Sequence, residues 1–217
     1  MRLTIVYDNN STESLKRGHG FSCLLEAKNK ILIDTGWDGH LLLFNMEKLG
    51  IKVEDIDSIV LSHSHWDHIG GLPTLLNLNK NLEVFGLKSF SDNLKGEIKS
   101  RAELIEISST TKIADGIYST GELGKEIKEQ SIAVESEKGI VIITGCSHPG
   151  LSLILEKSLR FGDTYGIVGG LHGFSQYSLL EGIQVIVPCH CSQNKKEIRE
   201  RYPKNYEEGF SGKVIEI

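Results

Sequence analysis

The chain has 217 residues, of which 39% are hydrophobic and 24% charged, with a net charge of −5 and a mean hydropathy of −0.15. These values exclude collagen-like, low-complexity and disordered chains, and a chain of this length buries about 70% of its extended surface on folding. No apolar run reaches the roughly 20 residues of a membrane helix, so we expect no membrane span. The chain also lacks a cluster of five Lys or Arg residues of the kind that binds nucleic acid, so we expect a small-molecule substrate.

Apolar alternation and β-branched residues predict a strand-rich first part of the chain. We place strands at Leu3–Asp8, Phe21–Ala27, Lys30–Asp34 and Ser58–Ser62, and helices from about Gly39 to Leu49 and from about Gly71 onward. Gly50 would end the first helix, and Pro73 is tolerated in the first turn of the second.

The middle of the chain, from Asn79 to Lys138, has weaker patterns. We predict short strands at Leu82–Phe85, Leu104–Ile107, Ile117–Ser119 and Ile132–Ser136. The polar stretch Gly86–Arg101 is expected to be a surface loop or a small helix.

Strands and helices alternate in the last third. We predict strands at Gly139–Thr144, Thr164–Val168, Ile183–Pro188 and Lys213–Ile217, and helices at Leu151–Phe161, Ser175–Glu181 and Gln193–Arg201. Because no repeat or linker divides the chain, we expect one domain over residues 1–217. The order of elements predicts an α/β sandwich with helices outside packed sheets.

The N-terminus favours the cytoplasm, and this bears on the cysteines. Met1–Asp8 lacks the apolar stretch of a signal peptide. The four cysteines, Cys23, Cys146, Cys189 and Cys191, are therefore expected to be free or metal-associated and not a disulfide framework.

The segment His63-Ser64-His65-Trp66-Asp67-His68 directly follows a predicted buried strand. Residues two apart in an extended segment point the same way, so His63 and His65 can hold one ion together. A following helix would turn Asp67 and His68 toward a neighbouring point. Imidazole and carboxylate ligands without cysteine favour an open, catalytic site for Zn²⁺, with Mn²⁺, Fe²⁺ and Mg²⁺ as alternatives. The competing interpretation is a helix cap with solvent-facing imidazoles.

Two further histidines follow predicted strands. His148 lies in Gly145-Cys146-Ser147-His148-Pro149-Gly150, and His190 lies in Pro188-Cys189-His190-Cys191. Strand ends are where an α/β sheet presents ligands, although each histidine alone would more often be a core or surface residue.

The His-x-His-x-Asp-His segment, together with Asp34-Thr35-Gly36 after an earlier strand, resembles the metallo-β-lactamase superfamily over nearly the whole chain. The resemblance implies a four-layer αββα sandwich with two metal ions at one edge of the sheets. It assigns His63, His65 and His148 to the first ion and Asp67, His68 and His190 to the second. Asp34 would orient a ligand imidazole, unless it is only a turn residue.

Asp8-Asn9, Gly18-His19-Gly20, Gly169-Gly170-Leu171-His172 and the segments around His148 and His190 resemble one branch of that superfamily. The branch contains the dihydropterin–ribofuranosylaminobenzene phosphate synthases and many relatives of unknown activity. Two features differ from the pattern. Cys146 stands where many members carry a bridging aspartate, and is either a second-ion ligand or a small buried residue. Gly86–Arg101 is also shorter than the branch's cap.

Such a site predicts a metal-dependent hydrolase that uses a metal-bound hydroxide on a small, anionic ester, phosphodiester, lactone or thioester. Asp67 would bind metal and orient the nucleophile. His172 and His19 would contact substrate or protonate the leaving group, or be plain loop histidines. Oligomerisation is left open.

The alternative is a transferase or synthase that condenses a pterin pyrophosphate with a ribofuranosylaminobenzene phosphate. Three other functions are less favoured. A di-iron electron carrier usually has Glu in place of His65. A tRNA-processing nuclease would be expected to have the bridging Asp and an RNA-gripping arm. A metal-binding sensor without activity remains the non-enzymatic interpretation.

Overall fold

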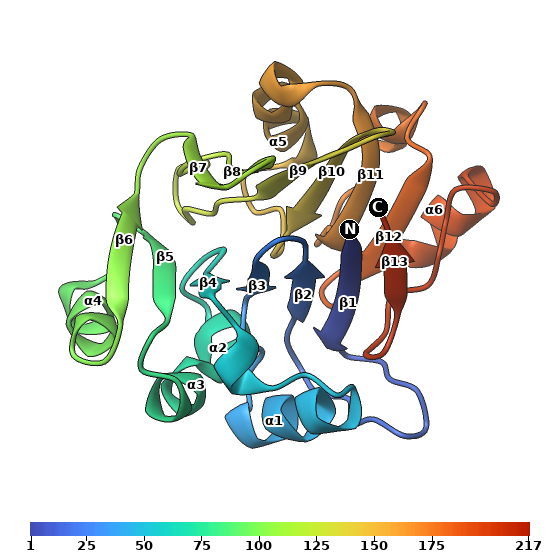
Figure 1. Ribbon diagram of the computed structural model, residues 1–217. Coiled ribbons are helices and arrows are strands. Elements are labelled where there is room, and N and C mark those ends of the chain that lie inside the picture. Colours follow the sequence, from blue (N-terminus) through green and yellow to red (C-terminus); the bar gives the residue numbers. More distant parts are fainter.

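Two β-sheets lie face to face, with helices on the outer face of each, in the computed structural model of residues 1–217 (Figure 1). The first sheet has the strand order β13-β1-β2-β3-β4-β5-β6, and the second has the order β12-β11-β10-β9-β8-β7. The four layers form the αββα sandwich that the resemblance implies, and they confirm the α/β sandwich predicted from the order of elements. No helix is both long and apolar enough to cross a membrane.

The strands are short and mostly buried. Those of the first sheet are β1 (Arg2–Tyr7), β2 (Ser22–Glu26), β3 (Lys30–Ile33), β4 (Ser58–Val60), β5 (Glu83–Leu87), β6 (Glu103–Ile107) and β13 (Val214–Glu216). Those of the second are β7 (Thr111–Ala114), β8 (Ile117–Ser119), β9 (Ile132–Ser136), β10 (Gly139–Thr144), β11 (Thr164–Gly170) and β12 (Val185–Cys189).

Six α-helices and three 3₁₀ turns connect the strands. The helices are α1 (Gly39–Lys48), α2 (Trp66–Ile69), α3 (Leu72–Leu78), α4 (Asp92–Lys99), α5 (Leu151–Ser158) and α6 (Lys195–Arg201). The turns are η1 (Val53–Asp55), η2 (Leu159–Phe161) and η3 (Tyr177–Leu180).

Each sheet is parallel in the part that carries the predicted ligands. Strands β3, β4, β5 and β6 pair in parallel, and so do β10, β11 and β12. The carboxyl ends of parallel strands meet at one edge of a sheet, which is where open α/β sheets bind ligands. The two sheets together thus present their loops at a common edge.

The main core lies between the sheets. A cluster of 38 buried residues contains Ile33 and Val60 from the first sheet and Val141 and Ile143 from the second. A second cluster of 12 residues lies beneath α5 and α6 and contains Ile140 and Ile142. Residues of β10 therefore alternate between the two cores, as the period of two in a strand requires.

Helix α1 forms where the sequence predicts it. The Asp38 carboxylate caps the first turn by accepting from the backbone N–H groups of His40 (2.8 Å) and Leu41 (3.2 Å). Gly50 follows the helix with φ of 71°, a conformation that favours glycine.

The predicted helix Ser175–Glu181 is wrong, because the segment forms only the 3₁₀ turn η3. Gly182 follows it with φ of 83° and closes the segment after one turn, too short a span for a cooperative helix. Strand β7 is absent from the prediction, since its partly exposed residues carry little apolar signal. The polar stretch Gly86–Arg101 contains helix α4, in line with the expected small surface helix.

Candidate metal centre

The His63–His68 segment leaves β4 at the edge where the two sheets meet. His63 is fully buried, whereas His65 is exposed, and their rings lie 4.6 Å apart between centroids. Helix α2 begins at Trp66 and turns Asp67 and His68 toward a neighbouring position, as predicted. The short linear segment therefore supplies four side chains to one place.

His148, which follows β10, completes a first group with His63 and His65. Its ring centroid lies 4.7 Å from that of His63 and 4.9 Å from that of His65. The three imidazoles that the resemblance assigns to a first ion are thus mutual neighbours.

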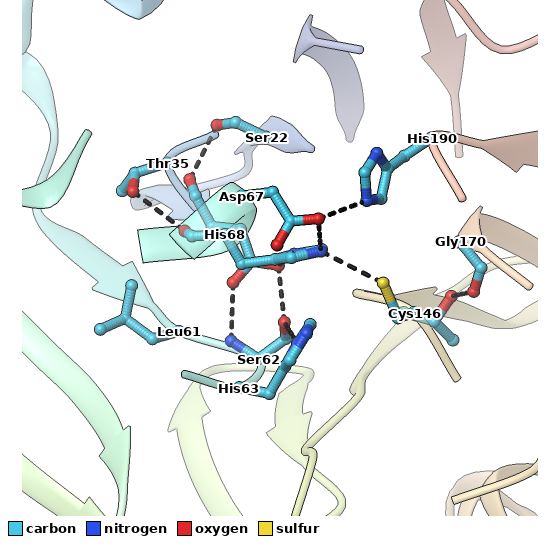
Figure 2. A network of polar contacts seen from close by, with 12 residues as sticks. Ser22, Thr35, Leu61, Ser62, His63, Asp67, His68, Cys146, Gly170 and His190 are labelled. Carbon is cyan, nitrogen blue, oxygen red and sulfur yellow. Dashed lines mark hydrogen bonds and ion pairs between the residues drawn. The ribbon is translucent and has the colours of Figure 1, made fainter. Parts of the chain in front are cut away.

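Asp67, His68 and His190 form the second group (Figure 2). Asp67 Oδ2 lies 3.0 Å from His190 Nε2 and 3.9 Å from His68 Nε2. His190 follows β12, so this group, like the first, draws side chains from both sheets.

Cys146 lies between the two groups. Its Sγ is 3.2 Å from His68 Nε2 (Figure 2). Its sulfur can join His63 and His148 as one set of ligand atoms, and His68 and His190 as another, with all atoms of each set within 4.8 Å of one another. This is the geometry of a shared ligand, and the thiol is buried.

Asp34 and Ser62 hold the ring orientations of two imidazoles. The buried Asp34 carboxylate accepts from Ser62 N (2.7 Å), Ser62 Oγ (2.6 Å) and His68 Nδ1 (2.6 Å). Because the Ser62 hydroxyl donates to Asp34, it accepts from His63 Nδ1 at 2.9 Å. The Nε2 atoms of His63 and His68 are thereby left to accept a cation.

Glu129 does the same for His148, and sequence reasoning missed it. This fully buried carboxylate accepts from His148 Nδ1 at 2.8 Å and from the backbone N–H groups of Cys146, Ser147 and His148 at 2.8–3.0 Å. Burial opposes its ionisation, but these bonds and the nearby imidazoles hold the Glu129 pKa at about 2. No spacing in the sequence links residue 129 to the later loop.

Asp8 and Asn9, at the end of β1, hold His190. Asp8 accepts from His190 N at 2.7 Å, and Asn9 Oδ1 accepts from His190 Nδ1 at 2.9 Å and from Gly20 N at 3.2 Å. The His190 Nε2 lone pair then faces the Asp67 carboxylate, an arrangement that needs a proton or a metal cation between them.

The donor set fits a divalent cation. His63 Nε2 is buried without any hydrogen-bond partner, an arrangement that is costly unless an ion or water binds there. Burial, reinforced by His68, lowers the His63 pKa well below its ordinary value, which keeps the ring in the neutral form that binds metals.

The acidic member of the site is ionised. Burial would raise the pKa of Asp67, but its hydrogen bond to His190 and the nearby His68 hold the pKa well below its usual range. Burial alone would lower the pKa of His68. The neighbouring Asp34 carboxylate outweighs burial, so the pKa of His68 lies above its ordinary value.

His19 and His172, the remaining predicted site residues, lie at the rim. His19 Nε2 is 3.2 Å from Asp67 Oδ2, and the His172 ring centroid is 5.1 Å from that of His148. Both side chains are exposed. His172 also lines a cavity of about 520 Å³ that reaches His148, Phe174 and Gln176.

Backbone strain is concentrated at this edge. The four non-glycine residues with positive φ are Asp34 (56°), Ser147 (61°), His172 (45°) and His190 (42°). Each lies in or beside the two groups, and strained backbone of this kind is typical of functional sites.

The two sheets approach closely next to the site. A Cβ on Gly145 would lie 2.2 Å from Ser62 Oγ and 3.2 Å from Asp34 Oδ2. Glycine is therefore required directly after β10, where the chain passes the residues that hold His63 and His68.

The four cysteines are free thiols, and Cys23 and Cys189 are buried away from the site.

Comparison with known proteins agrees with this geometry. The family model "Metallo-beta-lactamase superfamily" matches residues 16–84. A 7,8-dihydropterin-6-methyl-4-(beta-D-ribofuranosyl)-aminobenzene-5'-phosphate synthase of Methanocaldococcus jannaschii is 27% identical, over 92% of this chain and 90% of its own. An uncharacterized protein of the same organism is 29% identical, over 99% of this chain and all of its own.

Among solved structures, one described as a metal-dependent hydrolase of the beta-lactamase superfamily superposes with a TM-score of 0.83 at 25% identity. It covers all of this chain and 99% of its own. The human short-form tRNase Z shares the fold, with a TM-score of 0.68 at 18% identity, covering all of this chain and 99% of its own. The ligand segment, the family model over residues 16–84 and the αββα sandwich together make the chain similar to the metallo-β-lactamase superfamily.

Proposed function

We propose that the protein is a metal-dependent hydrolase of a small, anionic ester, phosphodiester, lactone or thioester. One observation carries the proposal: two adjacent groups of imidazole and carboxylate atoms share Cys146, and partners on the far side orient four of the five imidazoles. Orientation of this kind from behind is typical of metal ligands.

In this proposal His63, His65 and His148 hold one divalent ion, Asp67, His68 and His190 hold a second, and Cys146 lies between them. Nitrogen, oxygen and sulfur donors together favour zinc over manganese, iron or magnesium. When bound, such ions lower the pKa of a coordinated water and polarise the substrate's carbonyl or phosphoryl oxygen.

The chain's own residues would place the substrate. The exposed His172 and His19 rings lie beside His148 and His190 respectively, where each can donate a proton to a leaving group. A second cavity next to His148 is lined by Lys125 and Glu126, which offer one charge of each sign to a polar substrate. The free cysteines favour a reducing compartment, which supports a cytoplasmic role.

The second candidate is a synthase that joins a pterin pyrophosphate to a ribofuranosylaminobenzene phosphate. It is favoured by the full-length similarity to the Methanocaldococcus jannaschii synthase. The same centre would then bind the pyrophosphate leaving group, and the attacking atom would be the amino nitrogen of the aminobenzene in place of the oxygen of water.

The test combines metal analysis with a substrate panel. Purified protein loaded with Zn²⁺, Mn²⁺ or Fe²⁺ is assayed on p-nitrophenyl phosphodiesters, lactones and thioesters, and separately on a pterin pyrophosphate with the aminobenzene acceptor. We expect metal-dependent turnover of at least one hydrolytic substrate. Turnover of the pterin pair alone would establish the synthase instead, and failure to bind any metal would refute both.

A further inference from the structure

The loop between β1 and β2 brings His19 over the second group from the solvent side. His19 Nε2 lies 3.2 Å from Asp67 Oδ2, and its ring centroid lies 4.9 Å from that of His190. The ligand atoms of His19, Asp67 and His190 lie within 4.8 Å of one another. The side chain of His19 is 64% exposed, so this position faces solvent.

The turn that carries His19 is fixed to the residues that build this group. Gly18 N donates to Asp8 O at 3.1 Å, Gly20 N donates to Asn9 Oδ1 at 3.2 Å, and Phe21 N donates to Asp67 O at 3.2 Å. Asp8 and Asn9 are the residues that hold His190. The loop is therefore anchored on both sides of the imidazole that it presents.

Gly20 makes this close approach available. Its φ is +136°, and a Cβ at this position would lie 2.4 Å from the backbone oxygen of Asp67. A larger residue would push the turn, and His19 with it, away from the Asp67 carboxylate. Gly20 therefore allows the turn to hold His19 close to Asp67, which a surface loop without a function would not need.

Two triads of ligand atoms consequently share His190. The inner triad is completed by the buried His68 and Cys146, and the outer triad by Asp67 and His19. We propose that His19 is a ligand of the second metal ion on its solvent-facing side. This inference rests on the proposed function. His19 would supply an extra imidazole at a centre that has Cys146 where many members of the superfamily carry a bridging aspartate.

Because His19 is the exposed member, its coordination position is the one that an incoming substrate reaches first. His68 and His190 are buried and are held from behind by Asp34 and Asn9, and Asp67 is partly buried. With the ion bound, His19 would thus strengthen the hold on it from the side that faces solvent and substrate.

The experiment measures metal binding directly. Metal-free wild type, His19→Ala and His40→Ala are titrated with Zn²⁺ against a chelating dye, and with Co²⁺ while the visible absorption is recorded. His40 is the one histidine outside the site and lies exposed on α1, so His40→Ala is the matched control. We expect His19→Ala to bind the second equivalent at least about tenfold more weakly, the lower end of what even an outer-shell change costs.

The first equivalent should bind equally in all three proteins, and the absorption of the second Co²⁺ should change only in His19→Ala. Two equivalents bound with wild-type affinity and spectrum in His19→Ala would overturn the His19 assignment while leaving the proposed function intact. Wild type that binds no second ion would overturn the second position itself, and wild type that binds no metal would overturn the proposed function. Because His19 is exposed, loss of folding in the variant is not expected, and thermal unfolding checks this.

Discussion

The two sheets contribute to the centre in different ways. The first sheet delivers four side chains from the six residues His63–His68, on a single β4–α2 connection. The second delivers them singly or in pairs from three separate strand ends, as Cys146 and His148 after β10, His172 after β11 and His190 after β12. One half of the site is therefore local in sequence, and the other half exists only because parallel strands end side by side.

The supporting residues show this contrast only at His190. His63 and His68 are held by Ser62 and Asp34 of their own sheet, and His148 is held by Glu129, which precedes β9 of its own sheet. His190 of the second sheet is held by Asp8 and Asn9 of the first. Loss of the support to His190 should thus also loosen the contact between the sheets, whereas loss of the other supports should remain local.

The largest expected effect comes from removing the local half. The double substitution His63→Ala and His65→Ala should weaken metal binding by more than about a hundredfold, above the loss that outer-shell partners cause, and should abolish activity. Metal content after dialysis measures this, with His40→Ala as control. Full metal occupancy in the double variant would show that these histidines are not ligands.

Asp34→Asn should cost stability as well as metal. The substitution removes a buried charge that accepts three hydrogen bonds, so we expect unfolding to become easier by about 3–5 kcal/mol, in addition to weaker metal binding. Urea unfolding of the metal-free protein separates the two effects. Unchanged stability of the variant would show that Asp34 is only a turn residue.

Glu129→Gln tests the second sheet. A glutamine has one accepting oxygen, so it cannot accept both from His148 at Oε2 and from Cys146 N and Ser147 N at Oε1; we expect a loss of about 2–3 kcal/mol and weaker binding of the first ion. The control is Glu137→Gln, an exposed position in the β9–β10 turn. Retention of the wild-type metal affinity would mean that Glu129 supports the loop and not the His148 ring.

Asn9→Ala should have the smallest effect of the four. It removes one acceptor from His190 Nδ1 and one from Gly20 N, and it leaves the Asp8 contact intact. We expect the second ion to bind about tenfold more weakly, with stability changed by about 1 kcal/mol. Calorimetric titration checks this. An effect on the first ion would contradict the division of the site into two groups.

The sequence predicted much of the fold because most elements carry strong local signals. The ligand segment was readable because its side chains are close in sequence, and helix α1 because Asp38 and Gly50 mark its ends. Segment Ser175–Glu181 is predicted wrongly, because the spacing of Tyr177 and Leu180, which pack on the second core, suits one 3₁₀ turn as well as a helix.

The supporting residues were harder to predict for a physical reason. Glu129 reaches its partner across 19 positions of sequence, and Asn9 across 181. Contacts of this range follow from sheet topology, which no local pattern encodes. The burial of Glu129 could not be predicted either, because a glutamate enclosed by backbone N–H groups and a solvated glutamate are the same residue in the sequence.

The close approach at Gly145 has a kinetic consequence. Because β10 passes Ser62 without room for even a methyl group, the final ligand positions exist only after the two halves of the sandwich have docked. An ion cannot nucleate folding here, as it does in a zinc finger, and must instead enter a finished cleft. The folded apoprotein should therefore take up metal through the exposed His19 and His65 side, and the refolding rate should not depend on the concentration of metal.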